Sequence, residues 1–139
     1  YGPFGRPDMS LFKFTKSILS NEKIDFFNYG KHTRDFTYVD DIVEGIFAII
    51  NKPSKKFIPY NCFNIGGGKN IKLKLFLSLI QNHLGKKAKI KNLPLQLGDV
   101  KKTHASIKLL EKYSFYKPST TIKKGVKEFI NWYKKYYKT

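Results

Sequence analysis

The stretch from Val39 to Ile50 constrains the fold more than any other part of this sequence. Its apolar residues recur at intervals of three and four positions, which predicts one face of an α-helix: Val39, Ile42, Val43, Ile46, Phe47 and Ile50. Asp40 and Asp41 lie in the first turn, where the helix dipole favours negative charge. A helix with so apolar a face must pack against another part of the protein.

The rest of the sequence alternates predicted helices and extended segments. Helices are expected at 8–20, 71–84, 106–112 and from Thr120 or Thr121 to Tyr137, with Ser106 as an N-cap. Residues 71–75 also alternate like a strand, but the length of 71–84 favours a helix that Asn70 caps and Gly85 ends. Extended segments are expected at 24–27, 36–38, 60–65 and 88–91, and 28–35 reads as a loop. This order predicts one α/β unit.

Composition excludes several classes of protein. The chain has 139 residues, 41% of them hydrophobic, which is enough for a packed core and excludes disorder as the main state. No apolar run approaches the roughly 18 residues of a membrane-spanning helix. Cys62 is the single cysteine, so no internal disulfide forms, and the histidines give no metal-ligand spacing.

The net charge of +17 suits a basic nucleic-acid-binding module, and this alternative stays open. The lysines are spread through every segment, however, which favours a solvated basic surface. Only two of the 27 basic residues are arginines, Arg6 and Arg34. A guanidinium grips a carboxylate or phosphate with two parallel hydrogen bonds, which lysine cannot do. These two positions are therefore candidate anion-binding residues.

No catalytic constellation is complete in this sequence. Gly66–Lys69 lacks the full spacing of a phosphate-binding loop and is interpreted as a glycine turn. Tyr113 and Lys117 have the spacing of an acid/base pair, but Pro118 disfavours a helix there. For the three histidines, His32, His83 and His104, we expect surface or turn positions. We therefore assign no catalytic residue and no metal ligand.

Several sequence blocks, in their order along the chain, resemble a known family. They are YGPFGRPDM at 1–9, RDFTYVDD at 34–41, FNIG at 63–66 and LPLQLGDV at 93–100. The resemblance is to the later part of the extended short-chain dehydrogenases/reductases, most of all to the UDP-glucuronate 4-epimerases of capsule, lipopolysaccharide and pectin precursor pathways. Related UDP-sugar decarboxylases and dehydratases share the arginine-aspartate block and remain an alternative.

The resemblance implies an α/β fold that is the C-terminal part of an extended short-chain dehydrogenase/reductase and lacks most of the Rossmann sheet. Residues 1–139 would form a single substrate-binding portion, and the chain opens without an initiator methionine, so we expect a piece of a longer protein. The family's NAD-binding glycine loop and Tyr-x-x-x-Lys pair would lie upstream. The complete enzyme would use NAD to interconvert UDP-glucuronate and UDP-galacturonate in the cytoplasm, and this piece would be inactive alone.

The same resemblance assigns roles to five residues. Arg34 would contact the UDP diphosphate, and Arg6 would meet the glucuronate carboxylate or the phosphates. Phe27 would offer backbone groups to the uracil, and Asp99 would bind ribose hydroxyls. Pro3 would lie beside the nicotinamide.

The resemblance also implies partners for the chain. They are a UDP-sugar, the Rossmann half and, in the complete enzyme, a second copy; neither a membrane nor nucleic acid is expected. The 39–50 helix would lie on the Rossmann sheet. For the isolated chain we therefore predict an exposed apolar face and poor solubility.

Overall fold

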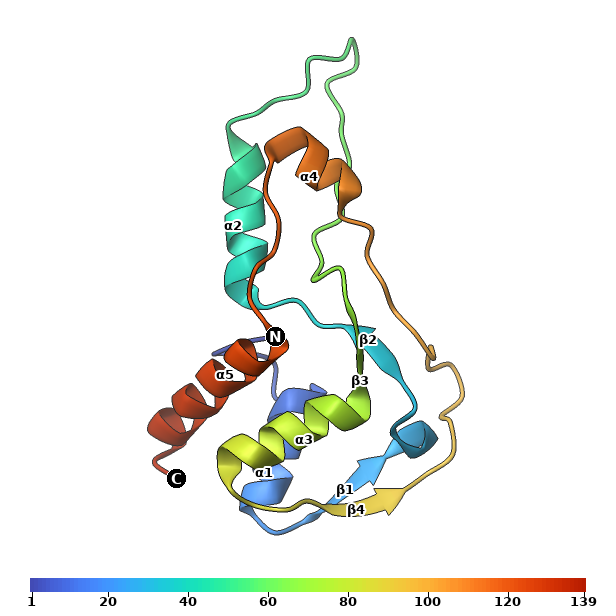
Figure 1. Cartoon of the computed structure of the whole chain (residues 1–139), viewed down its shortest axis with the longest axis vertical. Helices are drawn as coiled ribbons and strands as arrows, with labels where there is room; N and C mark the ends of the chain where they lie inside the picture. The colour runs from blue at the N-terminus through green and yellow to red at the C-terminus, as the bar shows by residue number, and fades with distance from the viewer.

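Three helices packed together form the base of the molecule. In the computed structural model, which describes residues 1–139, these are α1 (Ser10–Leu19), α3 (Leu73–Leu84) and α5 (Ile122–Tyr137). They lie beside β1 (Lys23–Phe26) and β4 (Lys89–Asn92), and Figure 1 shows this group as the lower part of the molecule. All of the main core comes from α1, β1, α3 and α5: Leu11, Phe12, Phe14, Ile18, Ile24, Phe26, Phe76, Leu77, Ile80, Leu84, Val126, Phe129, Ile130 and Tyr133.

Two short sheets complete the α/β class that the sequence predicts. Strands β1 and β4 pair in parallel, so that Ile24 lies opposite Ile90. Strand β2 (Thr33–Asp35) pairs antiparallel with β3 (Asn70–Lys72), which places Arg34 opposite Ile71. A short turn of 3₁₀ helix, η1 (Phe27–Gly30), joins β1 to the residues before β2. The strands position two of the candidate site residues, since Arg34 lies in β2 and Phe27 directly follows β1.

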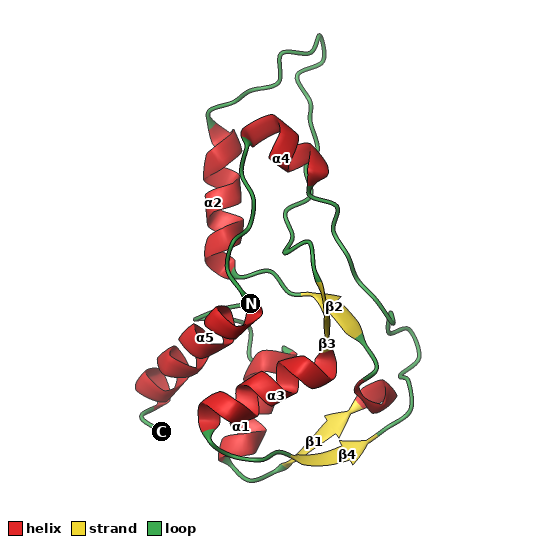
Figure 2. Ribbon diagram, in the orientation of Figure 1, coloured by secondary structure: helices red, strands yellow, loops and turns green.

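A second region, the arm, rises from the base. It consists of α2 (Val39–Ile50), residues 51–69, α4 (Lys108–Ser114) and residues 115–121 (Figure 2). The predicted helix at 39–50 is confirmed, and so is its exposed apolar face: Phe47 is 70% exposed and Ile50 is 63% exposed. Val43 and Ile46 are also exposed. The apolar face of α2 therefore remains largely open to solvent.

A buried carboxylate holds the arm together. The Asp41 side chain, 3% exposed, accepts hydrogen bonds from the Ser119 amide at 3.2 Å and the Thr120 hydroxyl at 3.0 Å. The Tyr116 hydroxyl donates to the Asp41 carbonyl at 2.7 Å. Burial, with the nearby charges of Asp41 and Glu44, raises the pKa of Tyr116 to about 12. These bonds fix residues 115–121 along α2.

The predicted strand at 60–65 is wrong. This stretch is extended, and its side chains alternate between half-buried and exposed, yet it belongs to no sheet. Phe63 packs on Tyr113 of α4, with ring centroids 4.9 Å apart, and Ile65 packs beside Gly45 of α2. A strand needs hydrogen bonds from a neighbouring strand, and none lies beside this segment.

Other differences are at the ends of elements. The ambiguous segment at 71–84 divides, since 70–72 form β3 and Leu73–Leu84 form α3. Asn70 is therefore not a helix cap, whereas Gly85 ends α3 as predicted. Ser106 does not cap α4, which begins after Ile107. Thr121 caps α5 as expected and accepts a hydrogen bond from the Lys124 amide at 3.2 Å. The extended segment expected at 36–38 lies earlier, at 33–35, because β3 pairs there.

Candidate functional site

Arg34 and Asp99, which are far apart in sequence, form an ion pair at the rim of a cavity. One guanidinium nitrogen of Arg34 lies 2.7 Å from Asp99 Oδ1, and the other donates to the Thr33 carbonyl at 3.1 Å. The Thr33 backbone bonds to Lys101 and Thr103, so that the segment after Asp99 runs alongside β2. Both side chains stay partly open to solvent, with Arg34 24% and Asp99 34% exposed. The pair is therefore positioned by β2 and accessible to a ligand.

The cavity beside this pair has a volume of about 250 Å³. It lies among α1, β1, η1, β2 and the start of α3, and its lining includes Phe27 and His32 as well as the ion pair. Its charged groups have both signs, since Asp8, Lys13 and Asp25 face the same space. Such a mixed lining suits a ligand with both hydroxyls and negative charges.

The turn that carries Phe27 is strained. The next two residues, Asn28 and Tyr29, have φ values of 49° and 52°, in the left-handed region that bulky residues rarely adopt. Their amides donate to the carbonyls of Pro94 and Leu93, both at 3.2 Å, which ties the turn to the loop that leads to Asp99. Gly30 follows with φ 68° and lies where a Cβ would collide with the Phe26 ring. Strain of this kind accumulates at binding sites.

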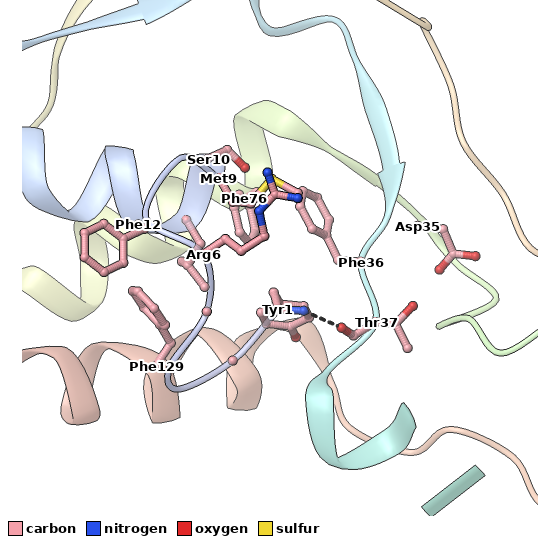
Figure 3. A pocket seen from close by; sticks show the side chains of 13 residues that line it. Tyr1, Arg6, Met9, Ser10, Phe12, Asp35, Phe36, Thr37, Phe76 and Phe129 are labelled. Carbon is pink, nitrogen blue, oxygen red and sulfur yellow. Dashed lines mark hydrogen bonds between the residues drawn. The ribbon is translucent and has the colours of Figure 1, made fainter. Parts of the chain in front are cut away.

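Arg6 lines a second cavity, of about 340 Å³, that adjoins the first. Figure 3 looks into it, with Arg6, Met9 and Ser10 on the N-terminal segment and Asp35, Phe36 and Thr37 on the stretch from β2 to α2. Ser10 and Phe36 line both cavities. The Arg6 guanidinium pairs with Asp8 at 2.6 Å and lowers the pKa of that carboxyl. Both members of the pair are mostly exposed.

Tyr1 forms the floor between this second cavity and α5. Its amino group donates to the Thr37 carbonyl at 2.8 Å (Figure 3), and burial raises the pKa of its phenol. The ring lies against Gly125 of α5, where any Cβ would collide with it. Pro3 is half-buried in the same N-terminal segment but lines neither cavity.

The glycine turn at 66–68 uses its amides within the protein. The Gly67 amide donates to Thr37 Oγ1 at 3.0 Å, and the Gly68 amide donates to Asp35 Oδ2 at 3.2 Å. Asp35 is almost fully buried and also accepts from the Ala105 amide at 2.9 Å. These amides are therefore not directed at a phosphate, in agreement with the interpretation as a structural turn.

Tyr113 and Lys117 do not form an acid/base pair. Helix α4 ends at Ser114, so the two residues do not share a helical face. The Tyr113 hydroxyl donates to the Lys52 carbonyl at 2.7 Å, and the Lys117 amine lies 3.5 Å from Glu111. Their spacing in the sequence therefore does not mark a catalytic pair.

Comparison with known proteins supports the resemblance on which these roles rest. Residues 1–66 match the model of the NAD dependent epimerase/dehydratase family. Protein CapI of Staphylococcus aureus is 44% identical over 99% of this chain and 46% of its own length. A UDP-glucuronate 4-epimerase of Thermodesulfobacterium geofontis is 42% identical over 96% of this chain and 40% of its own length. Residues 1–66 of this chain are thus similar to the NAD dependent epimerase/dehydratase family.

A solved UDP-glucuronic acid 4-epimerase has the same fold as this chain. The UDP-glucuronic acid 4-epimerase of Bacillus cereus, in complex with UDP-glucuronic acid and NAD, is 31% identical with a TM-score of 0.88. The match covers 99% of this chain and 43% of that protein. The expected fold class, the C-terminal portion of such an epimerase, is therefore confirmed, and the chain spans less than half the length of these relatives.

The structure brings four of the five predicted site residues into two adjoining cavities. Arg34, Asp99 and Phe27 line one cavity, and Arg6 lines the other. His32 was expected at the surface or in a turn, and this expectation is wrong, because its side chain is 3% exposed and lies beside Asp99. The signal that could have found it is its position two residues before Arg34, since such residues share a face in extended backbone.

None of the helices combines the length and the apolar character that crossing a bilayer would require.

Proposed function

We propose that this chain supplies the UDP-sugar site of an NAD-dependent 4-epimerase that interconverts UDP-glucuronate and UDP-galacturonate. The observation that carries the proposal is the convergence of Arg34, Asp99 and Phe27 on one cavity from three separate parts of the chain. The relatives named UDP-glucuronate 4-epimerase support the choice of sugar.

Arg34 suits a diphosphate because of its geometry. A planar guanidinium can donate two parallel hydrogen bonds to phosphate oxygens. It now donates to Asp99, so binding of a diphosphate exchanges a carboxylate for a more highly charged acceptor. Asp99, once released by Arg34, can accept hydrogen bonds from the ribose hydroxyls. Phe27, at the strained turn, faces the same space and offers its backbone to the base.

Arg6 suits the carboxylate that distinguishes glucuronate from glucose. Its present partner, Asp8, is exposed, and an exposed ion pair contributes little free energy. A sugar carboxylate can therefore replace Asp8 at small cost. Arg6 and Arg34 line two cavities that share Ser10 and Phe36, which supports a ligand with its sugar near Arg6 and its diphosphate near Arg34.

The residues described here do not form a cradle for the pyrophosphate of NAD. The amides of the one glycine-rich turn are bonded to Thr37 and Asp35. We therefore assign NAD, and the chemistry at the sugar C4, to a Rossmann half outside these residues, with Pro3 as the one group proposed to reach the nicotinamide. The exposed face of α2 and the unpaired extended segment at 60–65 lie on the arm, and we assign them to contact with that half.

Calorimetric titration of the chain with UDP, UDP-glucuronate and UDP-glucose tests this proposal. We expect UDP to bind. Arg34→Ala should weaken UDP binding about tenfold to a hundredfold, because charge-assisted hydrogen bonds are lost. Lys31→Ala removes an exposed charge near the same turn and should change the affinity for UDP less than about threefold.

UDP-glucuronate should bind several-fold more tightly than UDP-glucose, and Arg6→Ala should remove that difference. Equal affinities in the unaltered chain would contradict the role of Arg6. Tight binding to DNA that falls steeply with salt, without binding of UDP, would favour the nucleic-acid alternative.

A further inference from the structure

His32 lies against the proposed nucleotide site, yet the proposed function gives it no role. Its Nε2 atom is buried and has no hydrogen-bond partner. Asp99 Oδ2 lies 3.1 Å from it but is not aligned for a hydrogen bond. A buried polar atom without a partner costs free energy, so its place in the site calls for a reason.

Asp99 lies between two groups that can carry positive charge. Arg34 contacts Oδ1 of the carboxylate, and His32 approaches Oδ2. Both come from one short extended stretch, which is held by the bond from the Leu73 amide to the His32 carbonyl and by those of Thr33 to 101–103. The backbone therefore fixes His32 and Arg34 on the same side, facing one carboxylate.

We propose that His32 is a positioning residue, which takes up a proton and holds Asp99 in place when Arg34 turns to the diphosphate of a UDP-sugar. The inference rests on the proposed function. When Arg34 moves to the phosphates, Asp99 is left half-buried without its cation, and the diphosphate adds negative charge to the same cavity. Both changes favour the imidazolium form of His32, which would donate a charge-assisted hydrogen bond to Oδ2.

The charged groups around this cavity permit such an exchange. They come from each segment that packs there: Asp8 before α1, Lys13 of α1, Asp25 of β1, Arg34 of β2 and Asp99 of the 93–100 loop. Three of these five groups are acidic. Lys13 and Arg34 are the cations that oppose a charge on His32, and Arg34 is the one that the diphosphate would neutralise.

Proton uptake on binding of UDP is the direct test. Calorimetric titrations with UDP at pH 7, in buffers of different ionisation enthalpy, give the number of protons taken up per UDP. We expect an uptake of a measurable fraction of one proton per UDP bound. His32→Gln should abolish the uptake and weaken UDP about threefold to tenfold. His104→Gln, at an exposed residue outside the cavity, should leave both unchanged.

A measurement on the unaltered chain covers the case in which His32→Gln fails to fold. The imidazole nitrogens of His32, His83 and His104 can be followed by NMR as UDP is added. Only the His32 signals should move to imidazolium values. Binding of UDP without this change, or with proton uptake that survives in His32→Gln, would overturn the inference and leave the proposed function intact. Failure of UDP to bind would overturn both.

Discussion

The base and the arm of this molecule differ in how far they bury their apolar side chains. In the base, α1, α3 and α5 bury large residues against one another, and Phe76 and Ile80 have no exposed surface. In the arm, α2 is just as regular a helix, yet Phe47, Ile46 and Ile50 remain exposed. The arm is held instead by polar contacts around Asp41. One region thus contains its own core, and the other leaves an apolar helical face exposed.

The largest expected effect separates these two regions directly. Phe76→Ala removes a fully buried ring that stacks on Phe36 at 4.1 Å, and it should lower the free energy of unfolding by about 3–5 kcal/mol. Phe47→Ala removes the same group from the exposed face of α2 and should change it by less than about 0.5 kcal/mol. Denaturant unfolding measures both values. Equal losses would mean that the face of α2 is covered in solution, for instance by a second copy.

A smaller effect is expected at the polar contacts of the arm. Asp41→Ala leaves the amides of Ser119 and Thr120 without their acceptor and should destabilise the arm by about 1–3 kcal/mol. Hydrogen exchange should then speed up in α2 while α3 stays protected. Asp40→Ala, in the same helical turn but exposed, is the control and should cost at most about 1 kcal/mol. Faster exchange in α3 as well would show that base and arm unfold as one unit.

The smallest effect is the contribution of Tyr116, in the arm, to the dependence of stability on alkaline pH. The pKa of Tyr116 is about 12 in the folded chain and about 10 in an unfolded one, so the folded state retains a proton that the unfolded state loses. The stability contributed by Tyr116 is complete below about pH 10 and is lost as pH rises to 12. Tyr116→Phe should reduce this loss in melting experiments, whereas Tyr60→Phe, at an exposed residue, should not. An unchanged alkaline profile in Tyr116→Phe would show that other tyrosines cause it.

The sequence was most informative where a local rule is sufficient. Helical spacing predicted α2 and α5 closely, because side-chain periodicity and the Thr121 cap act within one segment. The prediction from sequence failed at 60–65, because this stretch has strand-like residues but no neighbouring strand to complete its hydrogen bonds. The same reason explains why Ile71 was ambiguous: β3 exists only because β2 lies beside it.

The candidate site, too, could be predicted from the sequence only in part. The rarity of arginine and the resemblance of two sequence blocks were enough to single out Arg34 and Arg6, because those signals lie in the sequence itself. The burial of His32 and its approach to Asp99 could not be read there. The two residues are far apart in sequence, and only the packing of the 93–103 segment along β2 brings them together.

The sequence by itself determined the helices, the α/β class and the two arginines, since each depends on residue type and spacing within a short stretch. The tertiary structure alone decided which extended segments became strands, which apolar face stayed exposed and which charges share a cavity. These outcomes depend on long-range contacts, and such contacts form only when distant segments pack against each other.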